Sequence, residues 1–101
     1  MTTPRTHTTT VRIPGSHPSL AGHFPGNPVV PGVVLLDCVL SEAQRWLGSA
    51  PAVSALSQCK FMTALLPEQT AQLELTLQGK ELRFGLTRDA VSVAKGAFTL
   101  G

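Results

Sequence analysis

Prolines crowd into one short segment and restrict what the chain can form there. Five of the eight prolines lie between Pro14 and Pro31, and three of them stand in the run Pro25-Gly26-Asn27-Pro28-Val29-Val30-Pro31. Proline fixes φ, removes a backbone donor and moves the preceding residue out of the helical region. The segment therefore cannot be a helix and has few amides to offer a sheet. We expect an ordered, extended loop that the surrounding structure holds in place.

A helix is expected directly after this loop, over Gly32–Leu47. Pro31 stands just before or at its first turn, nothing inside the segment breaks it, and Gly48 ends it. Between Val33 and Leu40 the segment is apolar on nearly every side, which is typical of a helix enclosed by protein. We therefore predict a central, buried helix whose second half reaches solvent.

The rest of the chain alternates between apolar and polar residues, which predicts strands joined as antiparallel hairpins by short turns. One sheet must then curl around one helix. Strands are expected around Val11–Ile13 and over Val53–Met62, Thr70–Leu77, Leu82–Leu86 and Val91–Phe98, with turns at Gln78-Gly79-Lys80 and Arg88-Asp89. Within the second of these strands, the residues expected on one face are Val53, Ala55, Cys59 and Phe61.

Length and composition limit the number of domains and the partners. The 101 residues make one domain, 1–101. Hydrophobic residues make up 43% and charged residues 14%, which leaves apolar surface to be covered and favours self-association. A net charge of +2 without a run of Lys or Arg argues against a nucleic-acid partner. No apolar stretch reaches about 18 residues and the Thr-rich start lacks an apolar core, so neither a membrane span nor a signal peptide is expected.

The two cysteines, Cys38 and Cys59, lie in apolar surroundings without CxxC spacing or a flanking His. This pattern favours buried free thiols over a disulfide or a metal pair. Free thiols suit a reducing cytoplasm.

Three residues around the junction of loop and helix are candidates for chemistry. Asp37 stands in the most apolar stretch, where an unpaired carboxylate would cost several kcal/mol, so it is either functional or paired, for example with Ser41. His23 lies on the proline-stiffened loop, which can fix an imidazole relative to a helix carboxyl, although a turn histidine bonded to backbone is the alternative. The Gly32 N–H has no intrahelical partner and can hold an oxyanion, or the glycine serves only a tight turn.

The fifteen residues His23–Asp37, with the sequence HFPGNPVVPGVVLLD, resemble the signature of the hot-dog-fold 3-hydroxyacyl-acyl-carrier-protein dehydratases. Two shorter segments, Lys60-Phe61 and Val93–Gly96, resemble the same family more weakly. The resemblance implies an α+β hot-dog fold, in which a curled antiparallel sheet wraps around one central helix, and a dimer. In length and in its Leu-Leu-Asp spelling the chain is similar to the compact dehydratases of polyene-type pigment and other specialised lipid clusters.

The resemblance also implies an activity, which is dehydration of a 3-hydroxyacyl thioester to the trans-2-enoyl thioester in fatty-acid or polyene-type lipid biosynthesis. His23 and Asp37 would form the catalytic pair, with the two members of one pair coming from different subunits. We expect His23 to take the C2 proton and protonated Asp37, its pKa raised by burial, to protonate the leaving hydroxyl. The Gly32 N–H would bind the thioester oxygen, and neither a metal nor an organic cofactor is needed.

Two positions depart from the usual pattern of that family. Asp37 stands where most of the dehydratase branch has Glu. An Asp at this position is similar to the related dehydratase-isomerase branch. Ser41 stands where family members usually have a Gln that orients the acid. Whether isomerisation follows dehydration therefore stays open, as do the acyl chain length and the pathway.

Substrate contacts are expected from apolar residues and from surface charges. Phe24, Val33 and Leu36 are candidates for the wall of an acyl pocket and equally plausible as core residues. The acyl chain would arrive on an acyl carrier protein, which is acidic. The candidates for a basic docking surface, or alternatively for solvated charges, are Arg45, Lys80, Arg83, Arg88 and Lys95.

Two other functions remain in view. A hot-dog thioesterase would hydrolyse the thioester, but that activity gives the His23-to-Asp37 motif no purpose. A non-catalytic hot-dog subunit that stabilises or modifies a related active chain fits Ser41 in place of Gln.

Overall fold

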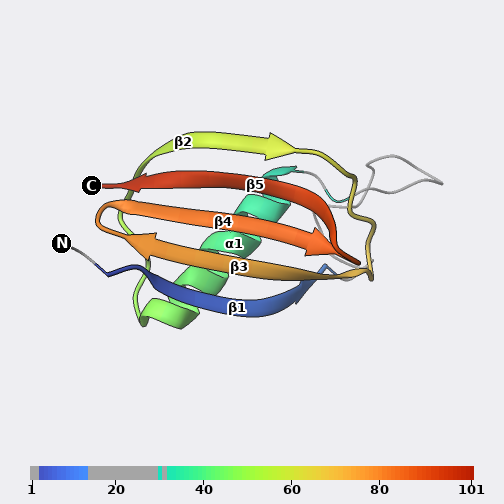
Figure 1. The fold of residues 1–101 in the computed structure, drawn as a ribbon, viewed down its shortest axis with the longest axis horizontal. Helices are drawn as coiled ribbons and strands as arrows, with labels where there is room; N and C mark the ends of the chain where they lie inside the picture. Colours follow the sequence, from blue (N-terminus) through green and yellow to red (C-terminus); the bar gives the residue numbers. More distant parts are fainter. Residues whose placement is uncertain (1–2, 14–29, 31) are drawn as a thin grey trace.

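A single sheet carries one helix across one of its faces (Figure 1). The computed structural model describes residues 3–13, 30 and 32–101. The strand order is β1-β3-β4-β5-β2, and every neighbouring pair is antiparallel. The elements are β1 (Arg5–Arg12), α1 (Gly32–Leu47), β2 (Val53–Phe61), β3 (Thr70–Gln78), β4 (Glu81–Arg88) and β5 (Val91–Leu100).

The element boundaries follow the sequence closely. The predicted helix is confirmed at both ends, and the four later strands lie where the alternation predicts them. β1 begins at Arg5, earlier than the apolar residues alone indicated, and Ile13 lies just after it. The loop expected between Pro14 and Pro31 lies outside the described residues, apart from Val30.

The core forms between α1 and the inner face of the sheet. On β3, Ala71, Leu73 and Leu75 are buried while the residues between them are exposed, so this strand has one apolar and one wet face. β4 and β5 continue the inner face with side chains that are at most a few per cent exposed. The largest of these core residues are Leu73, Leu75, Leu82, Phe84, Leu86, Val93 and Phe98.

α1 is covered on one side only. It buries Val34, Leu35, Val39 and Ala43 against the sheet, while Val33 is 66% exposed. The prediction of a helix enclosed on all sides is therefore wrong for the single chain. The reason is geometric, since one layer of sheet covers one face of a helix and the described residues of the same chain add no second layer.

The second half of α1 is held by an aromatic contact with the edge strand β1. The rings of His7 and Trp46 stack, with centroids 5.4 Å apart and planes 11° from parallel. The Arg5 guanidinium lies 5.3 Å from the centroid of the Trp46 ring, a cation–π contact that contributes about 0.5–1 kcal/mol at an exposed site. These contacts connect the second half of α1 to β1.

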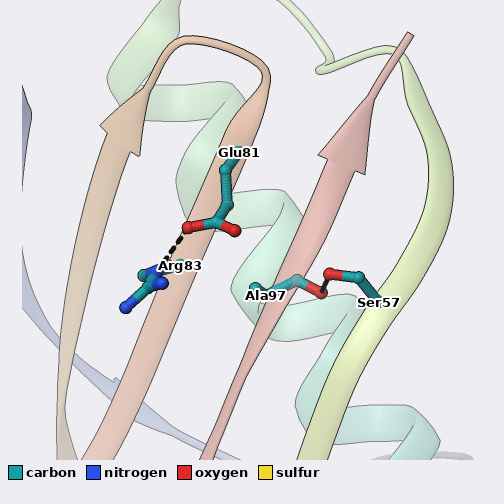
Figure 2. A network of polar contacts seen from close by, with 4 residues as sticks. All are labelled: Ser57, Glu81, Arg83 and Ala97. Carbon is teal, nitrogen blue, oxygen red and sulfur yellow. Dashed lines mark hydrogen bonds and ion pairs between the residues drawn. The ribbon is translucent and has the colours of Figure 1, made fainter.

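The other edge strand, β2, is irregular in its first half. Its pairing with β5 shifts between Val53 and Ala55 and again between Leu56 and Gln58, as in β-bulges. The two serines at the shifts compensate for lost backbone pairing. Ser54 Oγ donates to the Thr99 carbonyl at 3.1 Å. Ser57 Oγ donates to the Ala97 carbonyl, also at 3.1 Å (Figure 2).

The bulges change which face each β2 side chain occupies. Leu56 pairs with the buried Phe98, whereas Ala55 pairs with the exposed Thr99. Residues directly opposite in an antiparallel ladder point to the same face, so Leu56 lies on the inner face and Ala55 on the outer face. The prediction that Ala55 shares a face with Cys59 and Phe61 is therefore wrong, because strict alternation does not survive a bulge.

Cys38 and Cys59 are free, as predicted, but each is only half-buried. Cys59 lies on the edge strand and Cys38 on a flank of α1, so neither has neighbours on all sides. Burial raises the pKa of both thiols, and Glu42 and Asp37 raise that of Cys38 further. In the described part of the chain, no helix is both long and apolar enough to cross a membrane.

The turn between β4 and β5 contains two residues in the left-handed region, Asp89 with φ 51° and Ala90 with φ 64°. Two-residue hairpin turns of type I′ need positive φ at both central positions. Aspartate tolerates this conformation, but alanine pays for the closeness of its Cβ to the backbone. Ala90 is thus a local source of strain.

Replacing Ala90 by Gly should raise the free energy of unfolding by up to about 1 kcal/mol, since the strain exceeds the entropy that glycine loses. Urea denaturation of the two proteins measures this change. Ala55→Gly is the matched control, because Ala55 is exposed and lies in a strand, and it should lower stability. An Ala90→Gly protein no more stable than the original would contradict the strained turn.

Candidate active site

The start of α1 meets the end of β2, and this contact forms the centre of the candidate site. Gly32 is the first residue of α1, and the exposed ring of Phe61 lies directly against it. A Cβ added to Gly32 would stand 2.8 Å from Phe61 Cζ and 3.0 Å from Cε2. Only glycine therefore allows the ring to lie this close to the first turn. The Gly32 N–H has no carbonyl four residues earlier within the helix, so it is available to an acceptor at this end.

An open cavity of about 420 Å³ lies beside Gly32. It is lined mostly by apolar groups, namely Val30, Gly32, Leu35, Phe61, Met62, Thr63, Ala64 and Leu65. Backbone hydrogen bonds hold the walls in place. Val30 N donates to Leu65 O at 2.8 Å, and Met62 N donates to Val93 O at 2.8 Å. The cavity combines the positive end of a helix with an apolar wall, which suits a ligand with a polarised carbonyl and a hydrocarbon chain.

Asp37 lies on the open side of α1, away from the sheet. It is exposed, as are Val33 one turn before it and Ser41 one turn after it. The burial expected for Asp37 is therefore absent in the single chain, for the same reason that the helix is covered on one side only. Gln44, two turns after Asp37, is exposed on the same stripe.

The predicted site residues are only partly brought together by the described chain. Gly32 lines the cavity, Val33 is exposed beside it, and Leu36 packs against the core cluster. His23 and Phe24 lie outside the described residues. The pairing of His23 with Asp37 thus stays a prediction.

Sequence reasoning missed most of the residues between Phe61 and Leu65 that line the cavity. The sequence places Phe61 on one face of a predicted strand and in the Lys60-Phe61 segment, without indicating a cavity. A stronger signal is the segment from Phe61 to Leu66, which follows a strand and is apolar except for Thr63, and which continues to Pro67 before the polar residues Glu68 and Gln69. An apolar segment placed after a strand end indicates a surface that something else covers.

Apolar side chains are exposed next to the cavity, on the edge of the sheet and on the open side of α1. Phe61 is 52% exposed, and the inner face of β2 also leaves Leu56 open. Met62 and Val33 extend this surface toward the start of α1. Among residues 3–13, 30 and 32–101, no group of three or more His, Cys, Asp or Glu side chains could hold a metal ion.

Solved structures show the same architecture. The dehydratase heterocomplex ApeI:P from Xenorhabdus doucetiae matches with a TM-score of 0.84 and 26% identity, over 94% of this chain and 86% of that chain. A protein from Erwinia carotovora subsp. atroseptica has the same fold, with a TM-score of 0.82 and 23% identity over 97% of this chain and 84% of that chain. One antiparallel sheet carrying one helix, with these matches, defines a hot-dog protein and confirms the predicted fold class.

The family follows from the sequence comparisons. The model of the ApeI-like family, described as ApeI dehydratase, matches residues 1–97. The chain therefore belongs to the ApeI-like dehydratase family, which confirms the predicted resemblance.

Curated relatives named 3-hydroxyacyl-[acyl-carrier-protein] dehydratase FabZ also match the chain. The protein of Symbiobacterium thermophilum is 31% identical over 94 residues, which are 85% of this chain and 61% of the relative. That of Oenococcus oeni is 35% identical over 63 residues, which are 55% of this chain and 45% of the relative. The chain thus spans about half to two thirds of the length of these relatives.

Substitution of Gly32 tests the contact at the centre of the site. Gly32→Ala should push the Phe61 ring aside, because ring and Cβ cannot both keep their places. In a double-mutant cycle with Phe61→Ala, the cost of Gly32→Ala should shrink by about 0.5–1 kcal/mol or turn into a gain, since alanine is the better helix former. Urea unfolding of the four proteins measures the coupling. Strictly additive effects would mean that the ring does not lie on Gly32.

Proposed function

We propose that this chain removes water from a 3-hydroxyacyl group carried as a thioester on an acyl carrier protein, giving the trans-2-enoyl thioester. The observation that carries the proposal is the apolar cavity at Gly32, which opens where the His23–Asp37 motif enters α1. Membership of the ApeI-like dehydratase family and the FabZ relatives support the same reaction.

The chemistry needs one base, one acid and one oxyanion donor. His23 removes a proton from C2, and the electrons of that bond move toward the thioester carbonyl, whose oxygen accepts a hydrogen bond from the Gly32 N–H. Asp37 in its protonated form gives a proton to the C3 hydroxyl, the C3–O bond breaks, and water leaves as the C2–C3 double bond forms. The reaction is balanced without an oxidant or a cofactor.

The site is completed by a second hot-dog chain. Asp37 is exposed in one chain, so the water-excluded surroundings that the reaction needs would come from a partner chain. The open edge of β2, the exposed Phe61 and the uncovered side of α1 adjoin one another and supply the surface for that cover. The partner is a second copy of this chain or a related hot-dog subunit.

A second candidate function is that of a supporting subunit in a heterocomplex. The matching structure from Xenorhabdus doucetiae is described as a dehydratase heterocomplex, and Ser41 stands here where a Gln is usual. In this case the chain alone would be inactive and would gain activity when mixed with a related subunit. The free thiols Cys38 and Cys59 suit work in the cytoplasm in either case.

His23→Ala should lower turnover by at least about a hundredfold, because general base catalysis contributes that much. The assay follows loss of water from 3-hydroxyacyl carrier proteins of graded chain length by intact mass. His7→Ala is the control, since His7 stacks on Trp46 and lies away from the cavity, and it should keep near-normal turnover.

Three results would count against this assignment. Near-normal turnover of the His23→Ala protein would remove His23 from the mechanism. Release of free carrier thiol without an enoyl product would indicate a thioesterase. Inactivity of the original protein, relieved by a related hot-dog subunit, would favour the supporting role.

A further inference from the structure

A second cavity, of about 250 Å³, adjoins the one at Gly32. It lies between the segment that follows β2 and the β4–β5 turn, at one end of the sheet (Figure 1). Thr63 and Ala64 line both cavities, so the two spaces share a wall. The remaining residues that line the second cavity are Gln69, Arg88, Asp89, Val91 and Val93.

Arg88 is the distinctive residue of this second cavity. Its Nε is the one buried side-chain nitrogen or oxygen without a hydrogen-bond partner among the described residues. A buried donor without an acceptor lowers the stability of the fold. A ligand that supplies the acceptor would remove this cost. The guanidinium has five N–H donors in a planar fork that fits a carboxylate or a phosphate.

The neighbours of Arg88 accept few hydrogen bonds from its five N–H donors. NH1 of Arg88 donates to Asp89 Oδ2 at 2.9 Å, but the Asp89 side chain is 86% exposed and the pair is correspondingly weak. Gln69 accepts a hydrogen bond from Leu66 N through its Oε1. Ala64, Val91 and Val93 offer apolar surface only. The cavity therefore combines apolar walls with one cationic fork.

We propose that the second cavity is an extension of the substrate site and that Arg88 binds an anionic group of the substrate there. The proposal rests on the proposed function, because it takes the ligand to be an acyl thioester whose carbonyl lies at Gly32. Two anionic groups stand at a distance from that carbonyl. One is the phosphate of the carrier's phosphopantetheine arm, and the other is a carboxylate at the far end of the acyl chain.

Four small-molecule thioesters separate these sources. Two carry the same neutral 3-hydroxyacyl chain, one on phosphopantetheine and one on pantetheine without the phosphate. Two more use pantetheine, with acyl chains that end in a carboxylate or in a methyl group. Arg88→Gln should raise KM by about ten- to hundredfold for the thioester that carries the recognised anion, with little change in kcat. KM for the neutral counterpart should not change.

Matched variants separate anion binding from a structural role. Arg88→Lys keeps the charge but loses the fork and should recover part of the affinity. Asp89→Asn removes the competing carboxylate and should lower KM for the same thioester. Arg83→Gln is the control, because Arg83 lies on the same strand, pairs with Glu81 and faces the outer side of the sheet (Figure 2). None of the four thioesters carries a carrier protein, so a docking role of Arg83 does not enter this assay and every KM should stay unchanged.

The KM outcomes for Arg88→Gln differ from the result expected if the proposed function itself is wrong. A KM effect confined to the phosphopantetheine thioester identifies the phosphate, and one confined to the ω-carboxyl chain identifies the acyl end. Equal effects on charged and neutral thioesters, or no effect on any, would overturn the role of Arg88. If the original protein dehydrates none of them, the proposed function fails. Calorimetric binding of all four thioesters to the original and Arg88→Gln proteins then decides the role of Arg88, which is overturned if Arg88→Gln weakens the binding of neither the phosphopantetheine nor the carboxylate-terminated thioester relative to its neutral counterpart.

Discussion

The packing of one side of α1 on the inner face of the sheet is the contact on which the other features depend. Val34, Leu35 and Val39 are buried there, and this orientation fixes where every other helix residue points. It puts Gly32 under the Phe61 ring and turns Asp37 to the opposite side. The proposed oxyanion-binding amide of Gly32 and the carboxyl of Asp37 are thereby separated on one helix, with Gly32 at a formed cavity and Asp37 on an uncovered face.

The uncovered side of α1 and the β2 edge of the sheet both expose groups that proteins usually cover, namely apolar side chains and backbone hydrogen-bonding groups. Among the described residues, β2 has a neighbouring strand on one side only, and the exposed side chains of Phe61 and Met62 lie at its end. Bulges at Ser54 and Ser57 interrupt the first half of this edge, while Gln58–Phe61 keeps a regular register with β5. A strand from another chain can therefore pair more readily with the second half, next to the cavity. Covering this edge would also cover the open side of α1.

The sequence predicted the local structure well wherever one residue type decides the backbone. Pro31 and Gly48 bracket the helix at the observed ends, and the alternation in β3 assigns each side chain to its observed face. The prediction failed where contacts with other elements, and not the residue type itself, determine the conformation or the burial. Ala55 lies on the other face than predicted because of two bulges that no residue type in β2 indicates. The run from Val33 to Leu40 is apolar also on sides that the described part of the chain leaves open.

That second failure has a physical meaning. A sequence pattern reflects every surface that a helix meets in its working state, whereas the structure of one chain contains only the surfaces of that chain. The apolar residues around Asp37 that the sheet does not cover, Val33 above all, are consistent with the proposed second chain, which would cover them. The same argument explains why Gly32 and Asp37 could be singled out from the sequence while their burial could not. In the proposed dimer their surroundings include residues of the partner.

In the proposed mechanism each site takes its histidine from one chain and its acid from another. Two inactive proteins, His23→Ala and Asp37→Ala, carried on different affinity tags and isolated as a mixed dimer, test this arrangement directly. One of the two sites in such a dimer should be intact, so dehydration should return to as much as half of the original rate. A verified mixed dimer that stays inactive would place both groups on one chain and contradict the shared site.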